Sequence, residues 1–150
     1  MSDIVFYRCE KCGNIVAQIH NGGGTLTCCG QEMTRLEANV TDAAVEKHIP
    51  VVTREDGKIK VMVGSVLHPM IAEHYIEWIA LVSEEKVELA YLKPGQEPQA
   101  CLSELKSGTI YAYCNLHGLW KADFDFEEEY VNPDDVACSA EFSDGCIFPD

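Results

Sequence analysis

The feature that most constrains this fold is a set of two cysteine pairs near the N-terminus. Cys9 and Cys12 form a C-x-x-C turn, and the adjacent Cys28 and Cys29 follow sixteen residues later. The short apolar runs around them bury too little surface to fold alone, and a segment below about 40 residues generally needs a metal, a disulfide or a partner. We therefore expect residues 1–36 to form a small module held together by a metal ion.

Spacing alone leaves the identity of this metal open. A C-x-x-C turn presents two thiolates to one ion, as in rubredoxin-type knuckles and in zinc ribbons. Adjacent cysteines cannot use the same turn, so Cys28 and Cys29 should distort the tetrahedron. By spacing, a structural zinc ion is the commoner occupant and iron the alternative. Eight cysteines grouped in this way are a metal-ligand pattern rather than a disulfide framework.

The rest of the chain is predicted to be mainly β. Asp56-Gly57 between two alternating apolar runs is a strong hairpin signal. Residues 36–47 are expected to be a linker with room for one helical turn. In the segment 75–82 both the odd and the even positions are mostly apolar, so the segment also fits a helix. The predicted strands are 49–54, 58–63, 75–82, 86–92 and 109–113.

Four of the five histidines follow the linker, beside turn or strand-edge signals. Taken singly, each is an ordinary surface or core histidine. Their sequence neighbours are more informative, because Cys114-Asn115-Leu116-His117 places a thiolate and an imidazole three positions apart. Imidazole with one thiolate suits iron, copper or zinc, and five protein ligands exceed what a tetrahedral zinc uses. Iron with an open position is therefore plausible, although spacing does not establish that distant histidines converge. The candidate ligands are His48, His68, His74, His117 and Cys114.

The charge distribution bears on the partners. The formal net charge is −14, and ten of the 25 acidic residues lie in residues 122–150, which contain no lysine or arginine. No basic stripe is present, which argues against nucleic acid or an anionic membrane as a partner. No apolar run approaches the roughly 20 residues of a membrane span, and no secretion signal precedes the module. We expect a cytoplasmic protein that does not contact a membrane.

Six sequence pieces, in this order along residues 5–122, resemble the desulfoferrodoxin branch of the superoxide reductases. They are YRCEKCGNIV, CCGQEM, EKHIPV, HPMIAEHYIEWI, LKPGQEP and YCNLHGLWKA. The resemblance implies an all-β fold, with a small rubredoxin- or desulforedoxin-like module at 1–36 and an immunoglobulin-like β-sandwich at 37–122. It does not extend to residues 123–150, an acidic C-terminal extension of unknown role.

The resemblance also implies two iron ions per chain and reverses the preference for zinc. The first iron would be bound by Cys9, Cys12, Cys28 and Cys29. The catalytic iron would be bound by equatorial His48, His68, His74 and His117 and by axial Cys114. Glu46 and Lys47 match the family's catalytic pair over the open sixth position, where Lys47 would attract the anion and Glu46 would approach the iron after product leaves. His20 matches no ligand and is expected to face solvent.

By resemblance, the activity is the one-electron reduction of superoxide to hydrogen peroxide, a detoxification reaction of an anaerobe or microaerophile. Rubredoxin would supply the electrons, and the protein would be a homodimer. Two alternatives are a non-catalytic electron carrier and a structural zinc module attached to a metal-dependent oxygenase; the five-ligand set argues against both. Cys101 is expected to be a small buried thiol. Cys138 and Cys146 are expected to be non-catalytic thiols, in a tail whose aromatic residues suggest that it packs against the rest of the protein.

Overall fold

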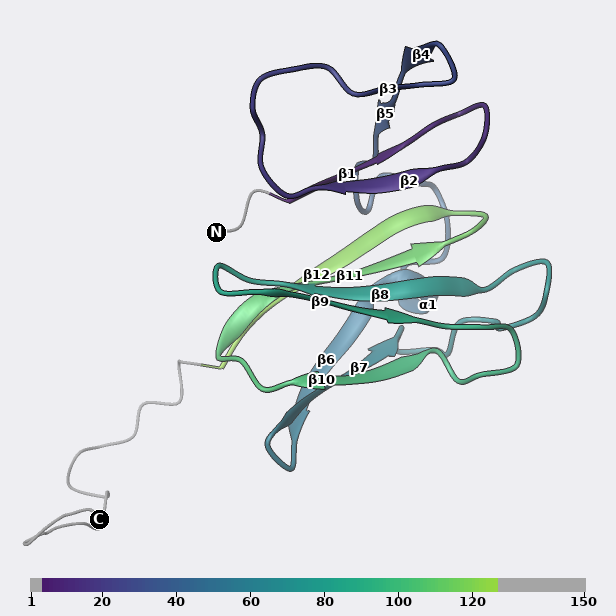
Figure 1. Cartoon of the computed structure of the whole chain (residues 1–150). Helices are drawn as coiled ribbons and strands as arrows, with labels where there is room; N and C mark the ends of the chain where they lie inside the picture. Colours follow the sequence, from purple (N-terminus) through teal and green to yellow (C-terminus); the bar gives the residue numbers. More distant parts are fainter. Residues whose placement is uncertain (1–3, 127–150) are drawn as a thin grey trace, which may run out of the picture.

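The computed structural model describes residues 4–126, which form two β-rich parts and one helical turn (Figure 1). The elements are β1 (Val5–Arg8), β2 (Ile15–Gln18), β3 (Thr27–Cys28), β4 (Gln31–Glu32), β5 (Thr34–Arg35), α1 (Val45–His48), β6 (Pro50–Glu55), β7 (Lys58–Val63), β8 (Ile76–Val82), β9 (Val87–Tyr91), β10 (Gln99–Ser103), β11 (Ser107–Cys114) and β12 (Gly118–Asp125). The expected all-β fold, a four-cysteine module followed by a β-sandwich, is confirmed.

The N-terminal part contains a three-stranded antiparallel sheet in the order β2-β1-β5 and a short β3-β4 hairpin. Strand β1 pairs with β2 from Val5 opposite Gln18 to Arg8 opposite Ile15. Cys9 and Cys12 follow the end of β1, Cys28 is the last residue of β3, and Cys29 follows it. Few of the residues here are buried, as expected of a module that does not depend on a large hydrophobic core.

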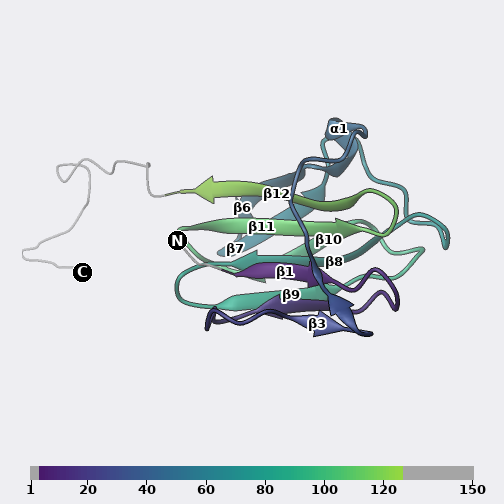
Figure 2. The same cartoon turned by 90° about the horizontal axis from the view of Figure 1, so that it is seen from above.

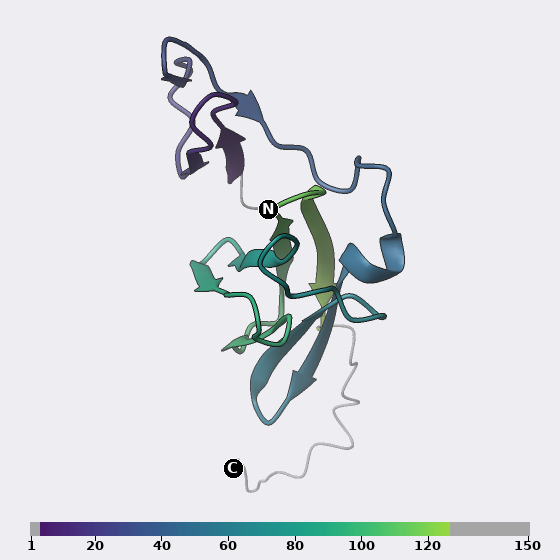
Figure 3. The ribbon, with the colours of Figure 1, turned by 90° about the vertical axis from the view of Figure 1, so that its right-hand side faces the viewer.

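The second part is a sandwich of two antiparallel sheets, ordered β10-β7-β6 and β12-β11-β8-β9 (Figures 1 and 3). Alternate residues of the facing strands point inward, as the twofold periodicity of a strand requires. Their buried side chains form one core. It consists of Ile59, Val61, Val63, Ile76, Ile79, Leu81, Leu102, Ile110, Ala112, Cys114 and Phe124.

Strand β8 is buried on both faces. Its residues Ile79 and Leu81 belong to the sandwich core, whereas Trp78 on the opposite face packs with Ile4 and Phe6 of the module. Figure 2 shows β1 lying over this sheet. A strand that is covered on both sides reads as a continuous apolar run. The helical alternative for residues 75–82 is therefore wrong.

The predicted hairpin is confirmed. Asp56 and Gly57, with φ of 51° and 74°, join β6 to β7 in a two-residue turn between Glu55 and Lys58. Strands β10 and β12 were not predicted. In β10 only Leu102 is buried, so the segment has little apolar pattern. Strand β12 begins inside the motif that contains the candidate ligands Cys114 and His117, and that motif was interpreted as a metal-binding loop. Strand β12 ends at Asp125, beyond the expected boundary at residue 122.

The linker ends in the single turn of α1, which carries His48 (Figure 3). This turn lies directly against the end of β7. A Cβ on Gly64 would overlap the carbonyl oxygen of Glu46 and lie 2.8 Å from the carbonyl carbon of Lys47. Within residues 4–126, no helix has the length and apolar character needed to cross a membrane. The expectations for Cys138, Cys146 and the packing of the tail lie outside the described residues.

Candidate metal centres

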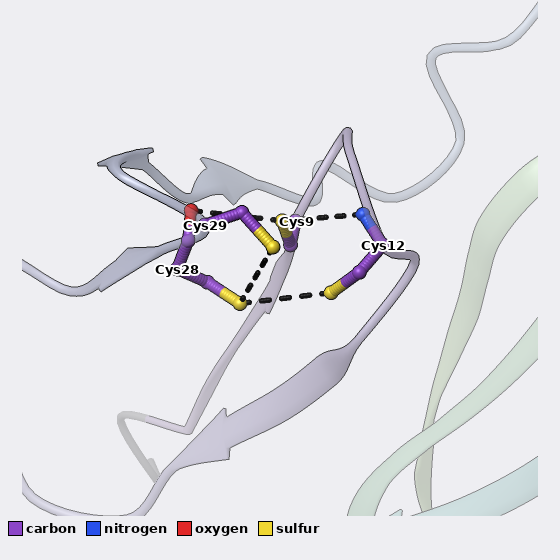
Figure 4. A group of neighbouring side chains, drawn as sticks. All are labelled: Cys9, Cys12, Cys28 and Cys29. Atoms are coloured by element: carbon purple, nitrogen blue, oxygen red, sulfur yellow. Dashed lines mark hydrogen bonds between the residues drawn. The ribbon is translucent and has the colours of Figure 1, made fainter.

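The four cysteines of the module converge on one point (Figure 4). The Sγ atom of Cys28 lies 3.6 Å from that of Cys12 and 3.9 Å from that of Cys29. Metal–sulfur bonds of about 2.3 Å in a tetrahedron place the sulfur atoms about 3.8 Å apart. Four thiolates with these separations fit one tetrahedral ion, so the cluster has the geometry of a metal centre.

Backbone conformation brings the four cysteines together, and backbone amides affect the pKa of their thiols. Cys29 and Gly30 both adopt positive φ, 54° and 78°, which turns the chain so that two adjacent cysteines face the same point. The backbone N–H of Cys12 points at the sulfur of Cys9 and is the main reason that the pKa of this thiol falls to about 6. Hydrogen bonding to Cys12 and the other thiols raises the pKa of Cys29 to about 12. Neighbouring thiolates without a cation repel one another, so full deprotonation of this cluster requires a cation.

The second cluster has four histidine rings arranged like the corners of a square. Nε2 of His48 lies 3.1 Å from Nε2 of His68 and 3.1 Å from Nδ1 of His117. Adjacent rings meet edge to face at centroid distances of 4.6–5.0 Å, whereas His48 and His74 face each other at 6.3 Å. Metal–nitrogen bonds of about 2.1 Å place adjacent equatorial ligands about 3.0 Å apart. The four rings therefore fit the equatorial plane of one ion.

Hydrogen bonds fix which nitrogen of each ring faces the centre. Nδ1 of His48 donates to the carbonyl of Ala44 at 2.7 Å, and Nδ1 of His68 donates to the carbonyl of Pro69 at 2.7 Å. Each ring is thereby left with an unprotonated Nε2 directed inward. Nε2 of His74 is buried and has no hydrogen-bond partner within residues 4–126. A buried polar atom without a partner is costly, and a bound metal would satisfy it.

Cys114 supplies the fifth candidate ligand. It ends β11, is fully buried, and its Sγ lies 3.8 Å from Nδ1 of His117. Burial raises the pKa of this thiol, while the backbone N–H groups of Leu116 and His117 lower it. The ligand atoms of His48, His68, His74 and Cys114 lie within 4.8 Å of one another. The thiol of Cys114 thus reaches the cluster from the buried side of the protein.

Asn115 joins the loops that carry these ligands. Its side-chain Oδ1 accepts the backbone N–H of Tyr75 at 2.9 Å, and its Nδ2 donates to the carbonyl of Glu73 at 3.0 Å. His74 lies between these two partners, so the Cys114 loop and the His74 loop are clamped together. Sequence reasoning did not assign Asn115 a role, although its place between two ligands was a usable signal.

Two sequence profiles match the chain. The profile described as Desulfoferrodoxin matches residues 40–123, and the one described as Desulfoferrodoxin, N-terminal domain, matches residues 3–36. This chain belongs to the desulfoferrodoxin family. The two side-chain clusters correspond to the two iron centres of desulfoferrodoxins, one with four cysteines and one with four histidines and a cysteine.

Similar proteins agree with this assignment. The desulfoferrodoxin of Clostridium acetobutylicum is 48% identical over 122 residues, which are 81% of this chain and 98% of that protein. A desulfoferrodoxin homolog of Archaeoglobus fulgidus is 49% identical over 117 residues, 77% of this chain and 94% of the relative. The crystal structure of the superoxide reductase from Treponema pallidum is 31% identical and superposes with a TM-score of 0.65, covering 80% of this chain and 98% of that one.

The desulfoferrodoxin fold places the other candidate residues as follows. Glu46 and Lys47 are exposed on α1, directly before His48. Burial lowers the pKa of His48 and His74, and the charge of Lys47 lowers both further. His20 is exposed, as expected. Cys101 is also exposed, so the expectation of a buried thiol is wrong; the inward position of β10 belongs to its neighbour Leu102.

Proposed function

We propose that this desulfoferrodoxin is a superoxide reductase. The observation that carries the proposal is a cluster of four histidines and the buried Cys114, with the exposed Lys47 on the turn that carries His48. Five protein ligands leave one position of an octahedral ion open. Superoxide is small and anionic, so it suits a single open position beside a cation. The similar proteins from Thermococcus kodakarensis and Treponema pallidum are named superoxide reductases.

In the proposed reaction, superoxide takes up one electron and two protons and leaves as hydrogen peroxide, without formation of dioxygen. Iron in the histidine site would supply the electron and the open coordination position. Cys114 would hold the iron as a thiolate, and a thiolate ligand would donate electron density to the metal, as it does in other iron proteins.

Glu46 and Lys47 are the proposed catalytic pair. Lys47 would attract superoxide and deliver a proton, since it is exposed and directly precedes the ligand His48 on α1. Glu46 would approach the metal once the product has left. Its backbone is already fixed, because its carbonyl accepts the N–H of Val66 at 2.9 Å and the hydroxyl of Ser65 at 3.3 Å. Both side chains then extend from an anchored turn.

Residues 1–36 and 37–122 would be two metal-binding units and residues 123–150 an added extension, in a homodimer that receives electrons from rubredoxin or a similar carrier. The support is the exposure of Cys12 and Cys29, which brings two ligands of the first centre to the surface where a carrier can dock. The thiol-rich centres also favour the reducing cytoplasm.

Metal analysis and pulse-generated superoxide test the proposal. The reduced protein should contain two irons per chain and consume superoxide with formation of peroxide and no dioxygen. Cys114→Ser should abolish this reaction and leave the spectrum of the four-cysteine iron unchanged, because Cys114 contributes nothing to that centre. A colourless zinc protein, or near-normal turnover of Cys114→Ser, would contradict the proposal.

A further inference from the structure

One buried tryptophan contacts two of the five ligands. Trp120 is only 1% exposed. Its ring stacks on the imidazole of His48, with centroids 4.7 Å apart and an interplanar angle of 27°. Its indole N–H donates to the backbone carbonyl of His117 at 3.2 Å. A single side chain therefore links ligands from α1 and from the loop between β11 and β12.

Trp120 contacts the one of these ligands, His117, whose ring is not oriented by a hydrogen bond from Nδ1 to a carbonyl. His48 and His68 are each oriented by a hydrogen bond from Nδ1 to a carbonyl. His117 directs Nδ1 toward the cluster instead, so that bond is unavailable to it. Its Nε2 makes no hydrogen bond in the described part of the chain. The backbone of His117 is held instead, through the hydrogen bond from the indole of Trp120.

The strand that carries Trp120 makes the indole a rigid support. Trp120 pairs with Ala112 in the eight-residue ladder between β11 and β12. The same ladder closes at Cys114 opposite Gly118, so the Cys114–His117 loop is the hairpin that joins these strands. The indole N–H reaches back three residues into this hairpin. Strand pairing thus fixes the indole, and the indole fixes the ligand loop.

We infer that Trp120 is a positioning residue, which keeps His117 coordinating through Nδ1 and holds the plane of the His48 ring. The inference rests on the proposed function only to the extent that the histidine cluster binds a metal. Simple filling of the core is the competing explanation, and it assigns no role to the indole N–H. Replacements that keep the ring but remove this donor separate the two explanations.

The test uses the full chain loaded with zinc and labelled with ¹⁵N-histidine. Long-range ¹H–¹⁵N spectra report which ring nitrogen of each histidine binds the metal. In the unchanged protein, His117 should bind through Nδ1, and His48 and His68 through Nε2. Trp120→Phe keeps a ring over His48 but lacks the donor, so the signals of His117 should broaden or shift to Nε2 binding while those of His48 stay. Trp120→Leu should perturb both.

A second measurement is the release of zinc from the histidine site to a chelator. Loss of a partner that orients a ligand commonly weakens metal binding 10–100-fold, so Trp120→Phe should release zinc about tenfold faster. Trp78→Phe is the matched control, because Trp78 is also buried but packs against Phe6 and Tyr113 rather than against a ligand. It should change neither His117 nor the release of zinc from the histidine site.

Substitution of Trp120 by 3-benzothienylalanine covers a failure of the phenylalanine variant to fold. This analogue has nearly the size and shape of tryptophan but carries sulfur in place of N–H. Normal His117 signals and normal zinc release in a folded donor-free protein would overturn the inference. Zinc-loaded wild type whose histidine spectra match those of the metal-free chain would instead overturn the proposed function.

Discussion

Lys47 brings a positive charge to the histidine cluster of a chain whose formal net charge is −14. Superoxide approaching such a chain is repelled at long range unless a local field directs it to the metal. Lys47→Ala should therefore slow the second-order reaction with superoxide by about tenfold and flatten or invert its dependence on salt, because exposed charges are screened over about 10 Å at 0.1 M. Pulse-generated superoxide at several ionic strengths measures both effects.

Glu46→Ala is the matched control for this experiment. Glu46 precedes Lys47 on the same exposed turn, but its carboxylate is assigned a role only after product has left. The encounter rate of Glu46→Ala should therefore not fall. An unchanged rate and salt dependence in Lys47→Ala would show that Lys47 is an ordinary solvated lysine.

The protonation states of the ligands predict how metal uptake depends on pH. Burial lowers the pKa of His68 to about 4 and lowers those of His48 and His74, so these rings are neutral at pH 7 and have no proton to lose. Burial raises the pKa of the Cys114 thiol, which must lose its proton to bind. Below the thiol pKa, affinity should rise with pH by about tenfold per unit on this account.

Zinc uptake at pH 7 by Cys114→Ser should accordingly release one proton fewer than uptake by the unchanged chain. Calorimetry in buffers of different ionisation enthalpy gives this number. The four-cysteine centre contributes equally to both proteins and cancels. Equal proton release would mean that Cys114 is not a ligand or is already ionised in the metal-free chain.

At the residue scale, the metal ligands could be predicted from the sequence motifs around them. The spacing Cys114-x-x-His117 and the sequence before His48 suggested a site, and the family resemblance supplied the full ligand set. The carbonyl of Ala44 could not be foreseen, because any residue provides a backbone carbonyl and only the turn of α1 brings this one to His48. Cys101 was mispredicted because a lone cysteine carries no signal of the face that it occupies on a strand.

At the scale of elements, strands were predicted correctly where a recognisable turn sequence joined them. Asp56-Gly57 fixed the β6-β7 hairpin and its register. Strand β8 was ambiguous because its two faces contact different layers, the sandwich core and the module, which only the tertiary arrangement reveals. Strand β10 escaped prediction for the opposite reason, since four of its five residues are not buried and the segment carries little apolar signal.

The close approach of β7 to α1 predicts a substitution with a large effect. A methyl group at Gly64 overlaps the Glu46 carbonyl and would push the turn that carries His48 outward. Gly64→Ala should lower the stability of the metal-free protein by about 1–3 kcal/mol, as overpacking does. It should also weaken zinc binding at the histidine site. Thermal unfolding and zinc titration measure these two changes.

Gly22→Ala controls for the general effect of replacing glycine. An added Cβ at Gly22 has no neighbour within 4 Å, and its backbone does not need positive φ. Its stability and zinc affinity should match those of the unchanged protein. If Gly64→Ala behaved like Gly22→Ala, the contact between α1 and the end of β7 would not be tight enough to position His48.

At the scale of the whole molecule, the module and the sandwich share a buried aromatic contact. The ring of Phe6 in β1 lies 5.1 Å from that of Trp78 in β8, and Trp78 stacks on Tyr113 at 5.6 Å with an interplanar angle of 7°. Sequence reasoning divided the chain near Leu36 but could not show that the two parts share a core.

Because of this shared core, metal binding by the four cysteines should determine whether Trp78 of the sandwich is covered. A segment of this size depends on its metal to fold, so a chain that fails to acquire that ion would uncover the ring of Trp78. Replacing both Cys9 and Cys12 by serine should therefore increase the binding of a hydrophobic dye and make residues 1–36 susceptible to protease, while the β-sandwich resists digestion. A protected segment and unchanged dye binding would show that packing alone holds the module. In an iron-starved cell, chaperones and proteases that recognise exposed aromatic surface would remove such chains, and the abundance of the protein would follow the supply of iron.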